Sequence, residues 1–263
     1  MLTERIYLYE NDDRVYIDTY VVNKNETRDA ILVIPGGGYQ TVCTEAEGEP
    51  IALEFVNRGY NAFVLQYRTG KDIVFPMHMQ DAASAMICIR KNAERFKINP
   101  KRVFAIGFSA GGHLCGCIST MFMCDEMKEL FGEEYKLIRP TGSILSYPVT
   151  TLNADNHVSS FAYLTGKAEE DITEEDKNKF SLEKWIGPDI APIYIWHTRT
   201  DALVDVKGTI LFIDTLAKAN AYYMASIFPY GPHSSDVTFA EPSAHAWRDL
   251  SEMWLRSLPD YEY

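Results

Sequence analysis

The chain alternates between short, nearly continuous apolar runs and longer stretches in which apolar residues recur every three or four positions. Continuous apolar runs are typical of strands covered on both faces, and the recurring pattern is typical of helices with one buried face. The first run differs, because apolar and polar residues alternate along it. We predict strands at 14–22, 30–34, 62–66, 103–106, 143–147, 193–197 and 222–228, and helices at 51–58, 79–96, 110–123, 206–219 and 244–258.

This order of elements predicts a mostly parallel sheet flanked by helices, in a single α/β domain over residues 1–263. The segment 151–188 interrupts the pattern, because it has no strand signal and contains the acidic stretch KAEEDITEEDKNKF. A solvated surface insertion is the simpler interpretation of this segment. A small cap over a site is the functional alternative, because long excursions inside compact domains tend to serve function.

The charge of the chain narrows the range of partners. Lys and Arg number 25 against 37 Asp and Glu, which gives a formal net charge of -12 with no basic block. Such a surface repels phosphate backbones and anionic lipids, so we expect neither nucleic acid nor membrane as a partner. A homodimer remains possible.

The opening residues MLTERIYLYENDDRV carry charges where a signal peptide would be apolar. No run approaches the roughly 18 apolar residues of a membrane span. Both observations favour the cytoplasm.

The cysteines show no metal or disulfide pattern. They are odd in number and include no Cys-x-x-Cys spacing, and Cys115 and Cys117 would point in different directions on a helix. We therefore expect small buried hydrophobes rather than zinc ligands or disulfides. The residues concerned are Cys43, Cys88, Cys115, Cys117 and Cys124.

The sequence GFSAG at 107–111 carries the strongest chemical signal, because it follows an apolar run and precedes a helical stretch. A Gly-x-Ser-x-Gly turn between a strand and a helix holds its serine in a strained conformation and presents the hydroxyl at the edge of the sheet. The flanking glycines are needed where strand and helix pass too closely for side chains. Ser109 is therefore the predicted nucleophile.

A serine nucleophile needs a histidine base and an acid that orients it, and in folds with this turn both follow the serine in the chain. His245 falls on the solvated face of the last predicted helix, whereas His233 lies in a Pro- and Gly-rich loop after the last strand. Asp201 lies in a loop after a buried strand, whereas Asp205 begins a helix and suits an N-cap. We predict His233 as the base and Asp201 as the acid. Chain position sets aside the other histidines, which are His78, His113, His157 and His197.

The stretch PGGGYQ at 35–40 follows an early strand directly. When a serine attacks a carbonyl, negative charge builds on the oxygen, and preorganised N–H groups aimed at it typically supply a few kcal/mol. One such group comes from the residue after the nucleophile, Ala110, and another from a loop after an early strand. Gly36, Gly37 and Gly38 would leave their amides bare beside the substrate, and a plain flexible turn is the simpler alternative. We predict an oxyanion hole formed by Gly37, Gly38 and Ala110.

Six motifs in order resemble those of a known family: PGGGY, EGEP at 47–50, GFSAGGH, YPVTT, WHTRTDALV and GPH. They are similar to the bacterial bifunctional feruloyl and acetyl esterases, which are α/β-hydrolases, and the resemblance runs from Ala30 to Leu258. It implies the α/β-hydrolase fold with a small cap insertion, and the roles given above to the serine, the histidine and the aspartate. The chain differs from many members in having Ser234 after the histidine and Asp205 where they have proline.

The resemblance implies a serine esterase that removes small acyl groups, acetyl above all, from carbohydrate such as acetylated xylo-oligosaccharides, with no metal or organic cofactor. Tyr39, Tyr147 and Trp196 could line the sugar site, although core or rim positions suit each of them better. An aryl formamidase or a general short-chain carboxylesterase is the alternative, because pocket shape selects the acyl and leaving groups. A binding module that has only kept the fold is disfavoured by the complete catalytic set.

Overall fold

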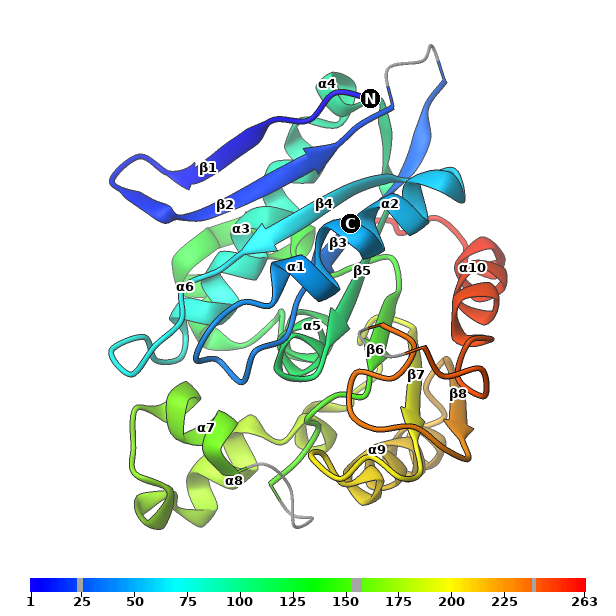
Figure 1. Ribbon diagram of the computed structural model, residues 1–263. Coiled ribbons are helices and arrows are strands. Elements are labelled where there is room, and N and C mark those ends of the chain that lie inside the picture. The colour runs from blue at the N-terminus through cyan, green and yellow to red at the C-terminus, as the bar shows by residue number, and fades with distance from the viewer. Residues whose placement is uncertain (23–25, 153–157, 238–239) are drawn as a thin grey trace.

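The computed structural model describes residues 1–22, 26–152, 158–237 and 240–263 (Figure 1). Its strands are β1 (Arg5–Tyr9), β2 (Asp12–Tyr20), β3 (Arg28–Ile34), β4 (Asn61–Gln66), β5 (Ile98–Phe108), β6 (Ser143–Ser146), β7 (Ile193–Thr198) and β8 (Tyr223–Phe228). They form one sheet in the order β1-β2-β4-β3-β5-β6-β7-β8. β2 pairs antiparallel with β1 and β4, and the other neighbours pair in parallel. The predicted mostly parallel sheet is confirmed.

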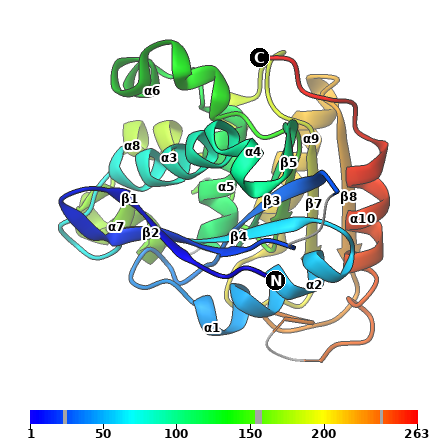
Figure 2. The ribbon, with the colours of Figure 1, turned by 90° about the horizontal axis from the view of Figure 1, so that it is seen from above.

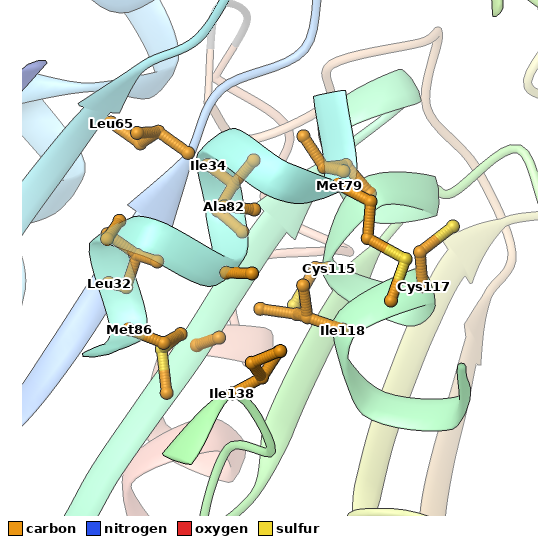
Figure 3. Close-up of a cluster of buried hydrophobic side chains, with 14 of the residues drawn as sticks. Leu32, Ile34, Leu65, Met79, Ala82, Met86, Cys115, Cys117, Ile118 and Ile138 are labelled. Atoms are coloured by element: carbon orange, nitrogen blue, oxygen red, sulfur yellow. The ribbon is translucent and has the colours of Figure 1, made fainter. Parts of the chain in front are cut away.

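Helices cover both faces of the sheet (Figure 2). One face carries α2 (Glu49–Asn57) and α10 (Trp247–Ser257), and the other carries α3 (Met77–Lys91), α5 (Ala110–Thr120) and α9 (Val206–Lys218). Each face has its own buried apolar cluster. In the close-up of Figure 3, Met79, Ala82 and Met86 of α3 lie beside Cys115 and Ile118 of α5 and Leu32 of β3.

Several predicted boundaries are wrong for local reasons. The helix predicted at 79–96 is divided into α3 and α4 (Ala93–Phe96), because the Asn92 side-chain amide donates to the Cys88 carbonyl oxygen at 2.8 Å and so helps to end α3. The helix predicted from 244 begins at Trp247, so His245 lies in the turn before it. The short elements α1 (Thr44–Glu47), α6 (Asp125–Phe131) and η1 (Gly132–Leu137) were not predicted.

The acidic segment at 151–188 contains α7 (Val158–Thr165), η2 (Glu169–Asp171), α8 (Glu174–Phe180) and η3 (Leu182–Trp185), and its described residues contain no strand. Thr173 and Asp176 begin α8 with a capping box. In Figure 1, α7 and α8 lie together at the bottom of the view, below the central strands. A Cβ placed on Gly38 would lie 3.7 Å from the Ser160 hydroxyl, so α7 runs beside the glycine loop.

The cysteines are all free, and Cys115, Cys117 and Cys124 are buried as predicted, whereas Cys88 is only partly buried. Cys43 is exposed, contrary to the prediction, and is the N-cap of the short helix α1. Across the described residues, no helix combines the length and the apolar character that crossing a membrane requires.

Candidate active site

Ser109 occupies the turn between β5 and α5 and has a positive φ of 52°. A residue other than glycine rarely adopts this conformation, and such strain is a mark of functional turns. The turn depends on close packing. A Cβ on Gly107 would lie 2.2 Å from the Gly111 carbonyl oxygen, and a Cβ on Gly111 would lie 2.3 Å from the Ile34 carbonyl oxygen. The predicted need for glycine on both sides of the serine is confirmed.

The structure brings together the three residues predicted to carry the chemistry. His233 Nε2 lies 2.9 Å from Ser109 Oγ, and His233 Nδ1 lies 2.6 Å from Asp201 Oδ2. An ionised carboxylate only accepts hydrogen bonds, so the neutral imidazole carries its hydrogen on Nδ1 and accepts from the serine through Nε2. The arrangement can therefore withdraw a proton from the serine hydroxyl.

Hydrogen bonds fix Asp201 from several sides. Its Oδ1 accepts from the backbone N–H groups of Leu203 and Val204, each at 2.9 Å. Its Oδ2 also lies 3.1 Å from Nε2 of the buried His197. Burial alone would raise the pKa of this carboxyl, but the hydrogen bonds from His197, His233 and the backbone outweigh it and hold the pKa well below its usual range.

His197 is a member of the site that the sequence argument set aside. Its Nε2 faces the Asp201 carboxylate and the Val204 carbonyl oxygen, which both only accept, so that nitrogen carries the hydrogen. Its Nδ1 is then free to accept from the Thr209 hydroxyl at 2.8 Å. Its position at the end of the strand that leads to Asp201 was the feature of the sequence that could have indicated a role in the site.

The competing candidates have other contacts. Asp205 is the N-cap of α9, and its side chain accepts from the Lys207 backbone N–H at 2.9 Å, as predicted. His245 has a side chain that is 68% exposed, and its Nδ1 lies 3.3 Å from Asp236 Oδ1.

The glycine loop passes directly beside the serine. A Cβ on Gly36 would lie 3.0 Å from Ser109 Cβ. Gly37 and Gly38 have positive φ angles of 125° and 64°, and their N–H groups have no acceptor among the described residues. Ala110 is the first residue of α5, so its N–H has no partner within the helix. The expectation of a bare Gly36 amide is wrong, because this N–H donates to Glu47 Oε2 at 2.7 Å.

The three aromatic residues considered for sugar binding lie in the interior, each no more than 1% exposed. The Tyr39 hydroxyl contacts His113 Nδ1 at 2.7 Å, and Trp196 Nε1 donates to the Ser146 hydroxyl at 2.9 Å. The Tyr147 ring packs edge-on against His233, with 4.9 Å between ring centroids. Tyr147 therefore contacts the base, and all three rings present almost no surface to solvent on which a sugar could bind.

Glu47 was quoted within the EGEP motif but was given no role from the sequence. It is 4% exposed, and its carboxyl contacts Gly36, Tyr147 and Ser234. Burial raises the pKa of this carboxyl, while its hydrogen bonds act in the opposite direction. Within the described ranges, no group of three or more His, Cys, Asp or Glu side chains is arranged to hold a metal ion.

The sheet order and the turn that presents the serine are those of the α/β-hydrolase fold, in its ester-hydrolase class. The chain belongs to the BD-FAE family, whose family model matches residues 17–216.

Relatives with known names agree with this assignment. The chain is 41% identical over 223 residues to endo-1,4-beta-xylanase B of Butyrivibrio fibrisolvens, covering 83% of this chain and 34% of that protein. It is 29% identical over 245 residues to an acetylxylan esterase of Xylanibacter ruminicola, covering 90% of this chain and 47% of that protein. The chain thus spans between a third and a half of these curated relatives.

A solved structure is similar over nearly the whole chain. The acetyl ester-xyloside bifunctional hydrolase of Caldicellulosiruptor lactoaceticus superposes with a TM-score of 0.84 at 28% identity, covering 97% of this chain and 96% of that one. The resemblance to acetyl-xylan esterase-like α/β hydrolases is confirmed.

Proposed function

We propose that this protein is a serine esterase that removes small acyl groups, acetyl above all, from carbohydrate such as acetylated xylo-oligosaccharides. One observation carries the proposal: an unbroken chain of hydrogen bonds from Ser109 Oγ through His233 to Asp201. Ser109 is the proposed nucleophile, His233 the base and Asp201 the acid that orients it.

In the first half of the reaction, Ser109 Oγ attacks the ester carbonyl carbon while its proton passes to His233 Nε2. Asp201 holds the imidazole in the required tautomer and stabilises the imidazolium. The N–H groups of Gly37, Gly38 and Ala110 are the proposed donors to the developing oxyanion. His233 then gives the proton to the leaving alcohol oxygen as the bond to the carbonyl carbon breaks.

In the second half, a water molecule attacks the carbonyl carbon of the acyl-enzyme. His233 Nε2 takes one proton from this water, and the second tetrahedral intermediate forms in the same oxyanion hole. When the intermediate collapses, the bond to Ser109 Oγ breaks and the serine recovers its proton from His233. The acid leaves and the starting state is restored.

The substrate class is supported by relatives and by charge. One relative is named as an acetylxylan esterase and a solved neighbour as an acetyl ester-xyloside hydrolase. Acetylated sugars carry small acyl groups on uncharged alcohols. Such neutral substrates suit a chain with a net charge of -12 better than anionic substrates would. The position of α7 beside the glycine loop supports the further proposal that the site takes an oligomer more readily than a polymer.

The test compares acetate release from acetylated xylo-oligosaccharides with release from intact acetyl-xylan, followed by mass spectrometry. We expect release from the oligomers to be faster by at least about tenfold, because on this proposal α7 restricts access to the site. Equal loss from polymer and oligomer would contradict the size limit. Loss from neither, with turnover of a formyl-amide in the same panel, would favour an aryl formamidase.

The matched control for every active substrate is Ser109→Ala. It should lower kcat by about 10⁶, since the members of a triad act as a unit. Retention of more than about a tenth of wild-type turnover would contradict the nucleophile assignment.

A further inference from the structure

Glu47, the last residue of α1, is a buried carboxyl that contacts three separate segments of the site. Its Oε2 accepts from the Gly36 N–H at 2.7 Å. Its Oε1 accepts from the Tyr147 hydroxyl at 2.8 Å and from the Ser234 hydroxyl at 3.3 Å. Among the described residues, no Lys or Arg forms an ion pair with it. A buried carboxyl without a cation is costly, so its retention calls for a physical reason.

Each of these partners lies against a reacting group. Gly36 is directly beside Ser109 and is followed by the two glycines proposed to bind the oxyanion. The Tyr147 ring packs on the His233 ring at an interplanar angle of 69°. Ser234 follows His233 in the chain and has a positive φ of 61°. The single carboxyl therefore connects the glycine loop to the histidine loop.

We propose that Glu47 is a positioning residue whose carboxylate holds these two loops in place and whose negative charge favours the imidazolium that forms on His233. This inference rests on the proposed function. His233 acquires a positive charge when Ser109 attacks, and a second carboxylate in a buried site stabilises that charge more than it would in water.

The groups that face His233 make this contribution separable from that of the acid. Asp201 contacts the imidazole directly and is itself held by His197. Tyr147 is neutral at ordinary pH, because burial raises its pKa well above 10. Glu47 acts across Tyr147 and Ser234, so its charge can be removed without breaking either hydrogen bond of the imidazole.

The experiment is Glu47→Gln, which keeps the shape of the side chain. The amide oxygen can accept from the Gly36 N–H, and the amide nitrogen can donate to the Tyr147 oxygen. We expect kcat to fall by about tenfold with KM nearly unchanged, because the stabilisation is lost only in the transition state. We also expect the acid limb of the kcat/KM profile to move to lower pH by about half a unit or more, because His233 holds its proton less tightly.

Two variants provide the controls. Glu45→Gln removes an exposed carboxylate from the same short helix and should leave both kcat and the acid limb unchanged. Tyr147→Phe keeps the charge of Glu47 and removes one of its hydrogen bonds, so it should lower kcat without moving the acid limb to lower pH.

Three outcomes would overturn the inference. Wild-type kcat in both Glu47→Gln and Tyr147→Phe would exclude any positioning role, and an unmoved acid limb in Glu47→Gln would exclude the role of charge. If Glu47→Gln does not fold, Glu47→Asp provides the test, because it keeps the charge and shortens the side chain. We expect its kcat to fall while the acid limb of the pH profile stays at the same pH. A shifted acid limb would contradict the inference. Activity that survives Ser109→Ala would instead refute the proposed function.

Discussion

Asp201 and Asp205 are identical side chains in one short stretch of the chain, and their surroundings give them different tasks. Asp201 is held by two backbone N–H groups and two imidazoles, all of which favour the ionised form. Asp205 caps a helix and has one backbone contact of this kind. The difference is one of chemistry, because only the first carboxylate reaches the histidine.

The comparison of Asp201→Asn with Asp205→Asn tests this difference. Asp201→Asn should lower kcat by about 10⁴, because the amide favours the wrong histidine tautomer. Asp205→Asn should change kcat little, since asparagine is an equally good N-cap. Steady-state kinetics on a nitrophenyl acetate, with thermal melts of both variants, provide the measurement. The reverse ranking would show that the acid has been misplaced.

At the same scale, the sequence could predict the three residues of the proposed triad but not the residues that hold them in place. Ser109, Asp201 and His233 each follow a strand that the apolar pattern reveals, so chain order was enough to choose them. Glu47 was not predictable, because its contact with Ser234 joins residues 187 positions apart. His197 was set aside because it ends the strand before the acid, and its contact with Asp201 forms only when the loop after that strand folds back.

At the scale of elements, seven of the eight strands in the described residues were predictable, whereas the edge strand β1 and the shortest helices were not. β1 was not predicted, because it is an edge strand with a mixed exposure pattern and an irregular register against β2. α1 has only four residues, too few for a helical period to show. α10 begins later than predicted because residues 242–246 form turns, in which the Ser243 hydroxyl donates to the Tyr230 carbonyl oxygen.

The contact between α5 and the end of β3 yields a prediction at this scale. Gly111→Ala should destabilise the fold by about 2 kcal/mol or more and lower activity, because its Cβ would lie 2.3 Å from the Ile34 and Pro35 carbonyl oxygens and would force the helix that carries Ser109 to shift. Gly187→Ala is the matched control, since nothing lies within 4 Å of its Cβ position. Urea denaturation and kinetics on both variants decide: equal effects would argue against close packing at Gly111.

At the scale of the whole molecule, His113 joins three segments that are distant in the chain. It belongs to α5 and is 1% exposed. Its Nδ1 accepts from the Tyr39 hydroxyl in the glycine loop, and its Nε2 donates to the Phe180 carbonyl oxygen at the end of α8, each at 2.7 Å. The neutral imidazole satisfies both partners, so the link between the glycine loop, α5 and the end of α8 depends on an uncharged His113.

This link predicts a dependence of stability on pH. Burial lowers the pKa of His113 from 6.5 to about 4, so the folded chain resists a proton that the unfolded chain accepts. The full contribution is present above pH 6.5 and is lost progressively as the pH falls to about 4, which amounts to about 3 kcal/mol. The buried His78, with a pKa lowered to about 3, acts in the same direction. The raised pKa of Glu47 acts in the opposite direction, because its protonation favours the folded state.

Since several groups titrate together, the test compares variants rather than reading one profile. His113→Gln keeps one acceptor and one donor for Tyr39 and Phe180 but cannot be protonated in this range. The free energy of unfolding, measured in urea from pH 7 to pH 4, should therefore fall by about 3 kcal/mol less in this variant than in the wild type. His245→Gln, at a side chain that is 68% exposed, should follow the wild-type profile. Parallel profiles for His113→Gln and the wild type would mean that the buried imidazole does not couple folding to pH.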